Sequence, residues 1–239
     1  MANLPTTQTR REWRGLFLEI TVVVVGILIA FALDSWWDRR AQASQERTYL
    51  RALRSDFAEN VERLGSAAAR QEGIELAGRQ LLALSRSRTP AGVDTVRILL
   101  GRVFNSGRFE PVMGAYEAIV NSGGLAQISD DSLRAALAAF ASHLRVSYVE
   151  QFSNNLYFSF IREYAGRLGG SFSDPAAADS NGNGSRTAEL SYITLLHEPP
   201  FQGQVAVRVY AERDVGRYYR ALQERAKVIL ILLDQQLHR

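Results

Sequence analysis

The feature that most constrains this chain is an apolar run near its N-terminus, residues 16–33, interrupted only by Glu19 and Thr21. As a helix rising about 1.5 Å per residue, the run reaches roughly 27 Å, close to the ~30 Å hydrocarbon core of a bilayer. We therefore predict that residues 15–37 form a transmembrane helix. Tryptophans flank the run where interfacial aromatic side chains are expected, and we predict three membrane-interface anchors: Trp13, Trp36 and Trp37.

The alternative interpretation of this run is a cleaved secretory signal. Arginines precede it, and Ala30-Phe31-Ala32 has the small-x-small form of a cleavage site. Against this, residues 20–32 are long for the apolar core of a signal, and Glu19 interrupts its leading edge. The residues after Ala32 also continue a helical pattern, which favours an uncleaved anchor.

Composition limits the rest of the molecule. About 200 residues follow the span, enough for one domain with its own core. The net charge is only +3 and the arginines are scattered. Proteins that bind nucleic acid usually cluster their basic residues on one face, so we expect no nucleic-acid partner. Cysteine is absent, which excludes a disulfide framework and a thiolate metal site.

The arginines on the two sides of the run bear on membrane orientation. Three of them lie in the tail over residues 1–14, and four follow soon after the span. Long domains cross a membrane largely regardless of charge, whereas a short basic tail resists crossing. We therefore predict that the N-terminus is cytoplasmic and that residues 38–239 are periplasmic, at a bacterial inner membrane.

Apolar residues repeat at helical spacing through most of residues 38–239. The first stripe begins near Leu50, continues to Leu84 and can fuse with the membrane helix, because residues 42–46 contain no breaker. A loop around Pro90 precedes a short helix through Val103. The first stripe and the short helix have these apolar positions: Leu50, Leu53, Phe57, Val61, Leu64, Ile74, Ala77, Leu81 and Leu84, then Val96, Leu99, Leu100 and Val103.

Three further helices are predicted. Pro111 suits the first turn of one that ends at Ser122-Gly123-Gly124. Ser129 or Asp130 caps a second, which is expected to run to Arg167 with Tyr148 on its apolar face. The last ends in a seam of Val215, Tyr219, Leu222, Ala226, Ile229, Leu233 and Leu237, but Val205, Val207 and Val209 alternate as in a strand and leave its first turns open. The predicted fold is all-α, with one N-terminal transmembrane helix followed by an extramembrane antiparallel helical bundle.

Two stretches resemble an uncharacterised family of bacterial single-span membrane proteins. Its members begin with a span of the type GEI-x-LVV-x-GILIA, followed by an Asn- or Asp-containing Trp motif. The matching residues here are 19–20, 23–30 and Asp34-Ser35-Trp36, and a second match runs from Tyr116 to Leu133 through the Ser-Gly turn. Leu18 stands where the family usually has Gly, and Trp37 follows Trp36. The resemblance implies a fold and a topology and brings no activity.

Chemistry-bearing motifs are few. Only His143, His197 and His238 are available. A zinc site of the His-Glu-x-x-His type is excluded because Pro199-Pro200 follows His197-Glu198 and the motif has no second histidine, and we expect His143, near the apolar stripe of the long helix, to be a packing or boundary residue. Residues 179–184 fit the first half of a calcium loop, but Leu190 occupies the position that needs a bidentate Glu, so we expect a flexible turn without useful Ca²⁺ affinity. We predict no catalytic residues, no cofactor and no metal site, and so no enzyme.

The span carries the strongest functional clue. On a helical wheel Glu19, Gly26, Ala30 and Asp34 fall within about 80° of each other. Gly26 and Ala30 form a small-xxx-small pair that admits a second helix closely, and a carboxylate near the membrane edge favours a partner. The alternative is that Glu19 only caps the span and Asp34 lies among headgroups. We predict that these four residues form a partner-helix interface, to an integral-membrane protein or a second copy.

The function expected from these features is a non-catalytic, single-pass accessory or structural subunit of a larger membrane complex, with respiratory or photosynthetic assemblies as plausible hosts. It would dock through its span and its helical domain. The alternative is an extracytoplasmic ligand-sensing helical domain that acts through a partner.

Overall fold

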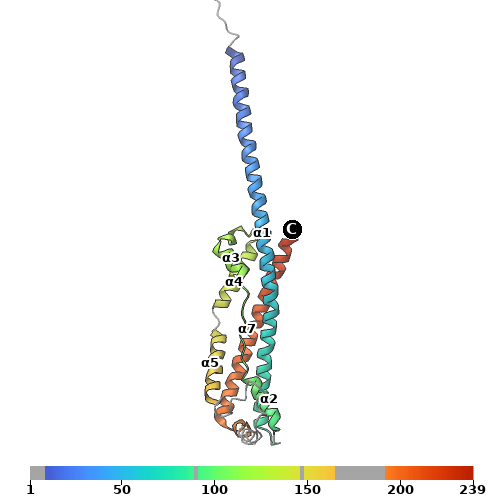
Figure 1. Ribbon diagram of the computed structural model, residues 1–239, viewed down its shortest axis with the longest axis vertical. Coiled ribbons are helices and arrows are strands. Elements are labelled where there is room, and N and C mark those ends of the chain that lie inside the picture. The colour runs from blue at the N-terminus through green and yellow to red at the C-terminus, as the bar shows by residue number, and fades with distance from the viewer. Residues whose placement is uncertain (1–8, 89–90, 146–147, 165–191, 239) are drawn as a thin grey trace, which may run out of the picture. The chain divides into compact units, whose positions relative to one another are not determined.

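The computed structural model of the protein describes residues 9–88, 91–145, 148–164 and 192–238, with side chains described from Thr21 onward. Every regular element within these ranges is a helix (Figure 1). The all-α prediction is therefore confirmed for the described part of the chain. Two compact units can be distinguished, Met1–Arg51 and Ala52–Arg239.

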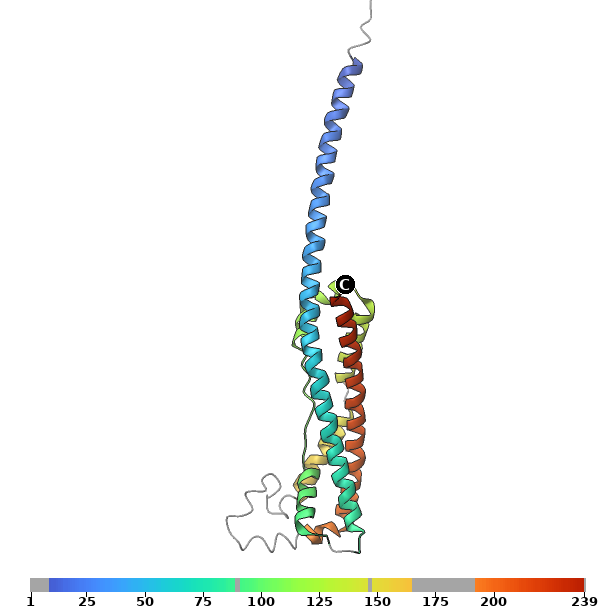
Figure 2. The same ribbon diagram turned by 90° about the vertical axis from the view of Figure 1, so that its right-hand side faces the viewer.

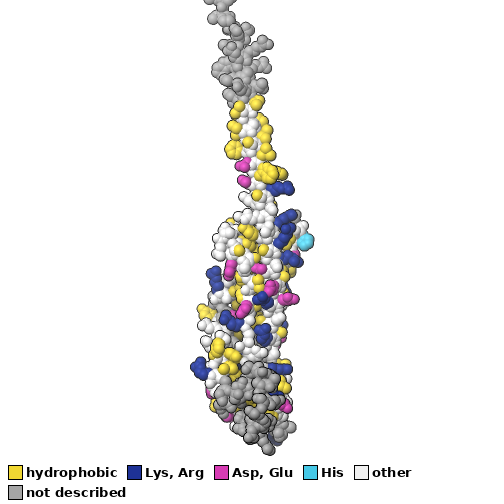
Figure 3. Space-filling model, viewed as in Figure 1, with side chains coloured by type: hydrophobic (Ala, Val, Ile, Leu, Met, Phe, Trp, Pro, Cys, Tyr) yellow, Lys and Arg dark blue, Asp and Glu magenta, His cyan; other side chains and the backbone are white. Residues whose placement is uncertain are grey.

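The first element, α1, is a single helix over Thr9–Ser85. The predicted membrane helix and the helix of the first apolar stripe are therefore continuous, a possibility that the sequence left open. Side chains from Thr21 to Arg40 are all exposed within the first unit. Figure 3 shows hydrophobic side chains gathered along this part of α1, whereas charged side chains of both signs are interspersed on the bundle surface.

Within the described ranges, the second unit contains four antiparallel passes. The first is α1 from Ala52 to Ser85. The second comprises α2 (Val93–Val103), a non-helical connector over residues 104–113 and α3 (Gly114–Asn121), and the third comprises α4 (Asp131–Arg145) and α5 (Tyr148–Tyr164). The fourth is α7 (Pro199–Leu237), which runs antiparallel to α1, α4 and α5 (Figures 1 and 2).

Buried side chains follow the predicted stripes closely. On α1, Leu53, Phe57 and Leu64 are buried, and on α7 the seam from Val215 to Leu233 is buried at every predicted position. Two polar pairs fix the antiparallel register of these two helices: Arg54 Nε lies 2.5 Å from Asp234 Oδ1, and Gln223 Nε2 donates to the carbonyl of Val61 at 2.9 Å. Packing therefore follows helical periodicity along the whole contact.

The connector over residues 104–113 corrects the prediction for Pro111. This proline lies before α3, which begins at Gly114, so it does not occupy the first helical turn. A length requirement accounts for the extended conformation: α7 has 39 residues and is about 58 Å long, whereas residues 93–121 as one helix would reach only about 44 Å. Ten extended residues at ~3.3 Å each bring the second pass to roughly 60 Å.

The connector runs alongside α1 (Figure 2), and polar side chains of α1 bind its backbone. Asn60, which is fully buried, donates from Nδ2 to the carbonyl of Val112 at 2.7 Å and accepts from the N–H of Val112 at 2.8 Å. Asp56 accepts from the N–H of Ala115 at 2.8 Å, which supplies the first turn of α3 with a cap. The connector thus pairs with side chains where a strand would pair with a neighbouring strand.

The predicted turn after α3 and the cap of α4 are both confirmed. Gly123 adopts a φ of 71°, the left-handed conformation that Gly accepts without strain. The Asp130 carboxylate accepts from the N–H of Leu133 at 2.8 Å, so Asp130 is the capping residue of α4.

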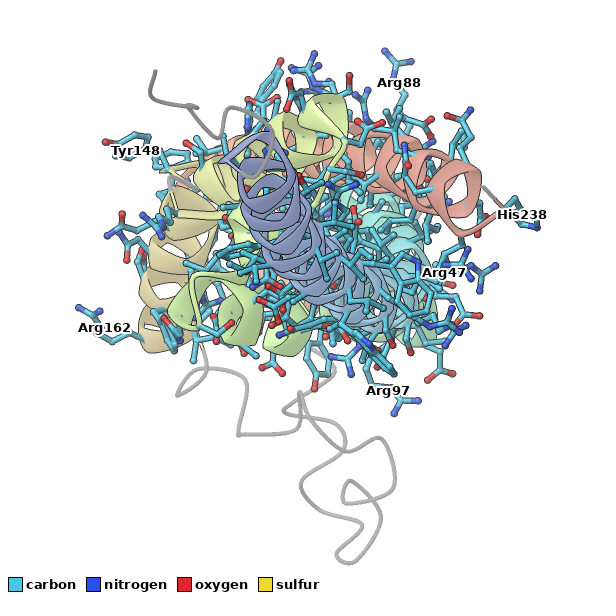
Figure 4. The ribbon with its side chains drawn as sticks, turned by 90° about the horizontal axis from the view of Figure 1, so that it is seen from above. Arg47, Arg88, Arg97, Tyr148, Arg162 and His238 are labelled. Atoms are coloured by element: carbon cyan, nitrogen blue, oxygen red, sulfur yellow. The ribbon has the colours of Figure 1, made fainter. Side chains whose placement is uncertain are left out.

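The single long helix expected from Asp130 to Arg167 is instead two helices, α4 and α5, with residues 146–147 between them outside the described ranges. Tyr148, predicted on the apolar face, is 77% exposed and points away from the bundle (Figure 4). The apolar spacing of α4 therefore does not continue in register past Arg145. The valines that alternate as in a strand are helical. They lie in α7, which begins at Pro199, and Val205 and Val209 are buried whereas Val207 is exposed.

The Asn60 contacts give a stability prediction. Replacing Asn60 by Leu removes both hydrogen bonds and leaves the half-buried N–H and carbonyl of Val112 unpaired. We expect the free energy of unfolding to fall by about 2–5 kcal/mol, measured by denaturant titration of the full-length protein in mild detergent. The control Glu62→Leu, on an exposed position of α1, should change it by no more than about 0.5 kcal/mol. Equal effects of the two substitutions would contradict this account of the connector.

Candidate functional site

The predicted partner-helix face lies on α1 in the first unit. Gly26, Ala30 and Asp34 are all exposed, and a Cβ added at Gly26 would meet nothing within 4 Å. Helical spacing places the three on one side of α1. Glu19 lies in the same helix, but its side chain is outside the described part of the chain.

The predicted interface anchors form a local aromatic group. Trp36 and Trp37 are 52% and 63% exposed, with ring centroids 5.4 Å apart in an edge-to-face arrangement. The guanidinium of Arg40 lies 5.7 Å from the Trp36 centroid. Trp13 is helical, but its side chain is not described. These large exposed rings next to a cation have the composition of an interfacial belt.

The histidines are dispersed. All three are exposed, and the Nδ1 atoms of His143 and His238 lie 2.7 and 2.6 Å from the carbonyl oxygens of Ala139 and Asp234. Within the described ranges no three His, Cys, Asp or Glu residues are grouped as metal ligands. The calcium-like turn over 179–184 and Leu190 lie outside the described residues.

A buried ion pair that the sequence analysis missed lies in α7. Arg208 and Glu212 are 2% and 1% exposed, and Nη1 of Arg208 is 3.2 Å from Oε1 of Glu212. The other guanidinium nitrogens bind the end of α2 and the start of the connector: Nε donates to the carbonyl of Val103 and Nη2 to that of Asn105, both at 2.7 Å. The guanidinium therefore joins α7 to the start of the connector.

Side chains of α5 and α7 complete this cluster. Ser153 donates to Oε1 of Glu212 at 2.5 Å, and the Tyr157 ring centroid lies 5.3 Å from the Arg208 guanidinium carbon. The hydroxyl of Tyr219 donates to Glu150 and accepts from the N–H of Phe109 at 3.1 Å. We call Arg208, Glu212, Ser153, Tyr157, Tyr219 and Glu150 the polar cluster.

Burial dominates the electrostatics of the polar cluster. It lowers the pKa of Arg208, and it raises the pKa of Glu212 because the carboxylate loses hydration; attraction between the two residues opposes both shifts. Burial and the bond to Glu150 raise the pKa of Tyr219. Its hydroxyl therefore keeps its proton at neutral pH and acts as a fixed donor to Glu150.

The sequence did contain a signal for this cluster. Positions 205, 208, 212, 215 and 219 repeat at spacings of three and four, so Arg208 and Glu212 occupy seam positions that the apolar pattern assigns to the core. A charged pair at i and i+4 on a buried face requires compensating partners. What the pattern could not supply was the identity of those partners, because they lie on the connector and on α5.

Searches against known protein families, curated proteins and solved structures find no match to this chain. Its candidate sites are therefore defined by geometry alone: an exposed apolar helix with a small-residue face in the first unit, and a buried polar cluster in the second.

The raised pKa of Glu212 predicts a pH dependence of stability. A carboxyl whose pKa is higher in the folded state binds its proton more tightly there, so its contribution is complete below the ordinary pKa of 4.5 and is lost as the pH rises through the folded value. We expect the wild-type protein to lose stability relative to Glu212→Gln as the pH rises from below 4.5 toward neutrality. The measurement is the free energy of unfolding of both proteins across this range. A difference that is constant, or that favours the wild-type protein as the pH rises, would contradict this assignment.

Proposed function

We propose that the protein is a non-catalytic, single-span membrane subunit that docks on an integral-membrane partner, or on a second copy of itself, through α1. One observation carries the proposal. The apolar window of α1 has a mean hydropathy of 1.6, and none of it is buried within the chain. An apolar surface of this size is stable only in lipid or against another apolar surface.

The face formed by Glu19, Gly26, Ala30 and Asp34 is the proposed contact with the partner helix. The open space around Gly26 supports it, because a neighbouring backbone can approach closely where no Cβ projects. Asp34 gives the same face a carboxylate that gains from a donor on the partner.

The proposed setting is a bacterial inner membrane, with the N-terminus inside and the helical domain in the periplasm. The basic tail before the run supports this orientation. Respiratory or photosynthetic assemblies are plausible hosts for a subunit of this kind.

A ligand-sensing helical domain that acts through a partner is the second candidate. The polar cluster favours this candidate. Nη1 of Arg208, within the cluster, and Oε1 of Gln71, beside it, are buried and have no hydrogen-bond partner among the described residues. Charged groups retained inside a bundle are places where a polar ligand can be recognised.

The docking proposal predicts a defect in Gly26→Leu. A Leu side chain blocks close helix approach without shortening the span, and it meets no atom of the chain itself. Contacts at such interfaces are worth roughly 0.6–2 kcal/mol each, so association should weaken several-fold to about thirtyfold. The measurement is co-purification of native partners in mild detergent, together with self-association in bilayers.

The matched control for Gly26→Leu is Val24→Leu, which lies about 160° around the helix from Gly26 and should leave association unchanged. If Gly26→Leu inserts normally and keeps every association, the span is an anchor only, and the docking proposal fails.

The orientation gives a separate prediction. A reporter that is active only outside the cytoplasm, fused after Arg239, should be active, because the long domain crosses the membrane and the basic tail does not. An inactive reporter would show the opposite orientation, with the helical domain in the cytoplasm. A mature protein that begins at Leu33 would establish a cleaved signal in place of the anchor.

A further inference from the structure

A cavity of about 100 Å³ lies beside the polar cluster in the second unit. Its walls come from all four passes: Gln71 of α1, Gly107 and Arg108 of the connector in the second pass, Asn154 of α5 and Arg208 of α7. Arg108 is exposed, so the cavity reaches solvent beside the connector. An engineered cavity of ~150 Å³ holds benzene, so this one has room for about four or five non-hydrogen atoms.

Two residues that line the cavity each have a buried polar atom without a hydrogen-bond partner among the described residues: Oε1 of Gln71 and Nη1 of Arg208. Gln71 is 3% exposed, and its Nε2 donates to the carbonyl of Gly107 at 3.0 Å, which fixes the amide so that Oε1 is an available acceptor. Nη1 of Arg208 has Glu212 nearby as an ion pair but is not aligned with it for a hydrogen bond. A buried polar atom of either kind costs free energy until it is paired.

These two atoms specify complementary groups on a ligand. The Gln71 oxygen requires a donor, and the Arg208 nitrogen, which is part of a cation, binds a carboxylate oxygen best. The single molecule that pairs both best therefore carries a donor and an anionic acceptor within a few bonds of each other.

Charge around the cavity selects a ligand without net charge. Two arginines, Arg108 and Arg208, and two glutamates, Glu150 and Glu212, line it, so their formal charges cancel. A net cation or anion would leave one charge unbalanced beside the buried residues Arg208 and Glu212, which is unfavourable. A zwitterion introduces one charge of each sign, and the lining already holds a partner for each.

We propose that this cavity is a binding site for the ammonium and carboxylate groups of a small α-amino acid. Nη1 of Arg208 donates to the carboxylate, and Oε1 of Gln71 accepts from the ammonium group, whose charge Glu150 and Glu212 balance. Glycine, with five non-hydrogen atoms, matches the volume. The site belongs to the helical domain and does not depend on docking through α1, so each proposal stands or falls by its own experiment.

The experiment is calorimetric titration of the full-length protein in mild detergent with glycine. Acetate, methylammonium and urea serve as small comparators, because the first two carry one half of the zwitterion each and urea is uncharged. We expect saturable binding of glycine at micromolar to millimolar concentration, accompanied by a rise in Tm, and binding of each comparator at least tenfold weaker.

Two variants separate a ligand site from a general effect on folding. Asn154→Phe places a large side chain in the cavity and leaves Gln71 and Arg208 in place, so glycine binding should be lost while the helical signal is retained. Asn155→Phe, at the next and exposed position of α5, is the matched control and should bind glycine normally. Gln71→Leu should weaken binding at least tenfold.

Several results would overturn the proposal. Absence of saturable heat at millimolar glycine would leave the cavity as a site for water only. Equal binding by Asn154→Phe and the unchanged protein would place glycine elsewhere. Tighter binding of acetate than of glycine would show that the site selects an anion.

Discussion

The second unit depends on how the backbone of the connector is paired. An extended segment inside a bundle presents N–H and carbonyl groups that no helix satisfies, and each would cost about 1–3 kcal/mol if buried alone. The four buried polar or charged side chains of the described core, Asn60, Gln71, Arg208 and Glu212, lie around this segment. Three of them bond directly to backbone at residues 103–112, and Glu212 neutralises the guanidinium of the third. The core is therefore polar where the connector requires it and apolar elsewhere.

The same constraint explains why a cavity forms beside the connector. The backbone of an extended chain is narrower than that of a helix, whose Cα atoms lie on a cylinder of about 2.3 Å radius. Where the connector replaces a helix in the second pass, the remaining helices cannot close the space with apolar side chains alone. The polar cluster fills part of it, and the cavity of about 100 Å³ is what remains. The position of the candidate ligand site thus follows from the length that the second pass must cover.

Much of this fold could be predicted from the sequence, because most of it is helix with a regular apolar face. The stripes of α1, α2 and α7, the turn at Gly123 and the cap at Asp130 depend on local spacing and local backbone chemistry. The connector could not be predicted in this way, since Pro111 suits an extended segment as well as a helical first turn. The break before Tyr148 escaped for a similar reason: apolar spacing alone does not show where the register ends. The polar cluster required partners distant in sequence, such as Ser153 for Glu212, and periodicity contains no information about them.

Gln71 places the candidate ligand site in contact with α1, the helix that also carries the apolar span. Occupation of the cavity would pair Oε1 of Gln71 and Nη1 of Arg208, two atoms on different helices that both hold the connector. A ligand shifts a conformational equilibrium only by the difference between its affinities for the two states. The arrangement that brings Gln71 and Arg208 together around one small molecule is the arrangement such a ligand would favour. Any state in which α1 and α7 move apart beside the connector separates these two groups and loses the ligand. The contact between α1 and α7 at this level is therefore where occupancy of the cavity would be felt by the rest of the helical domain.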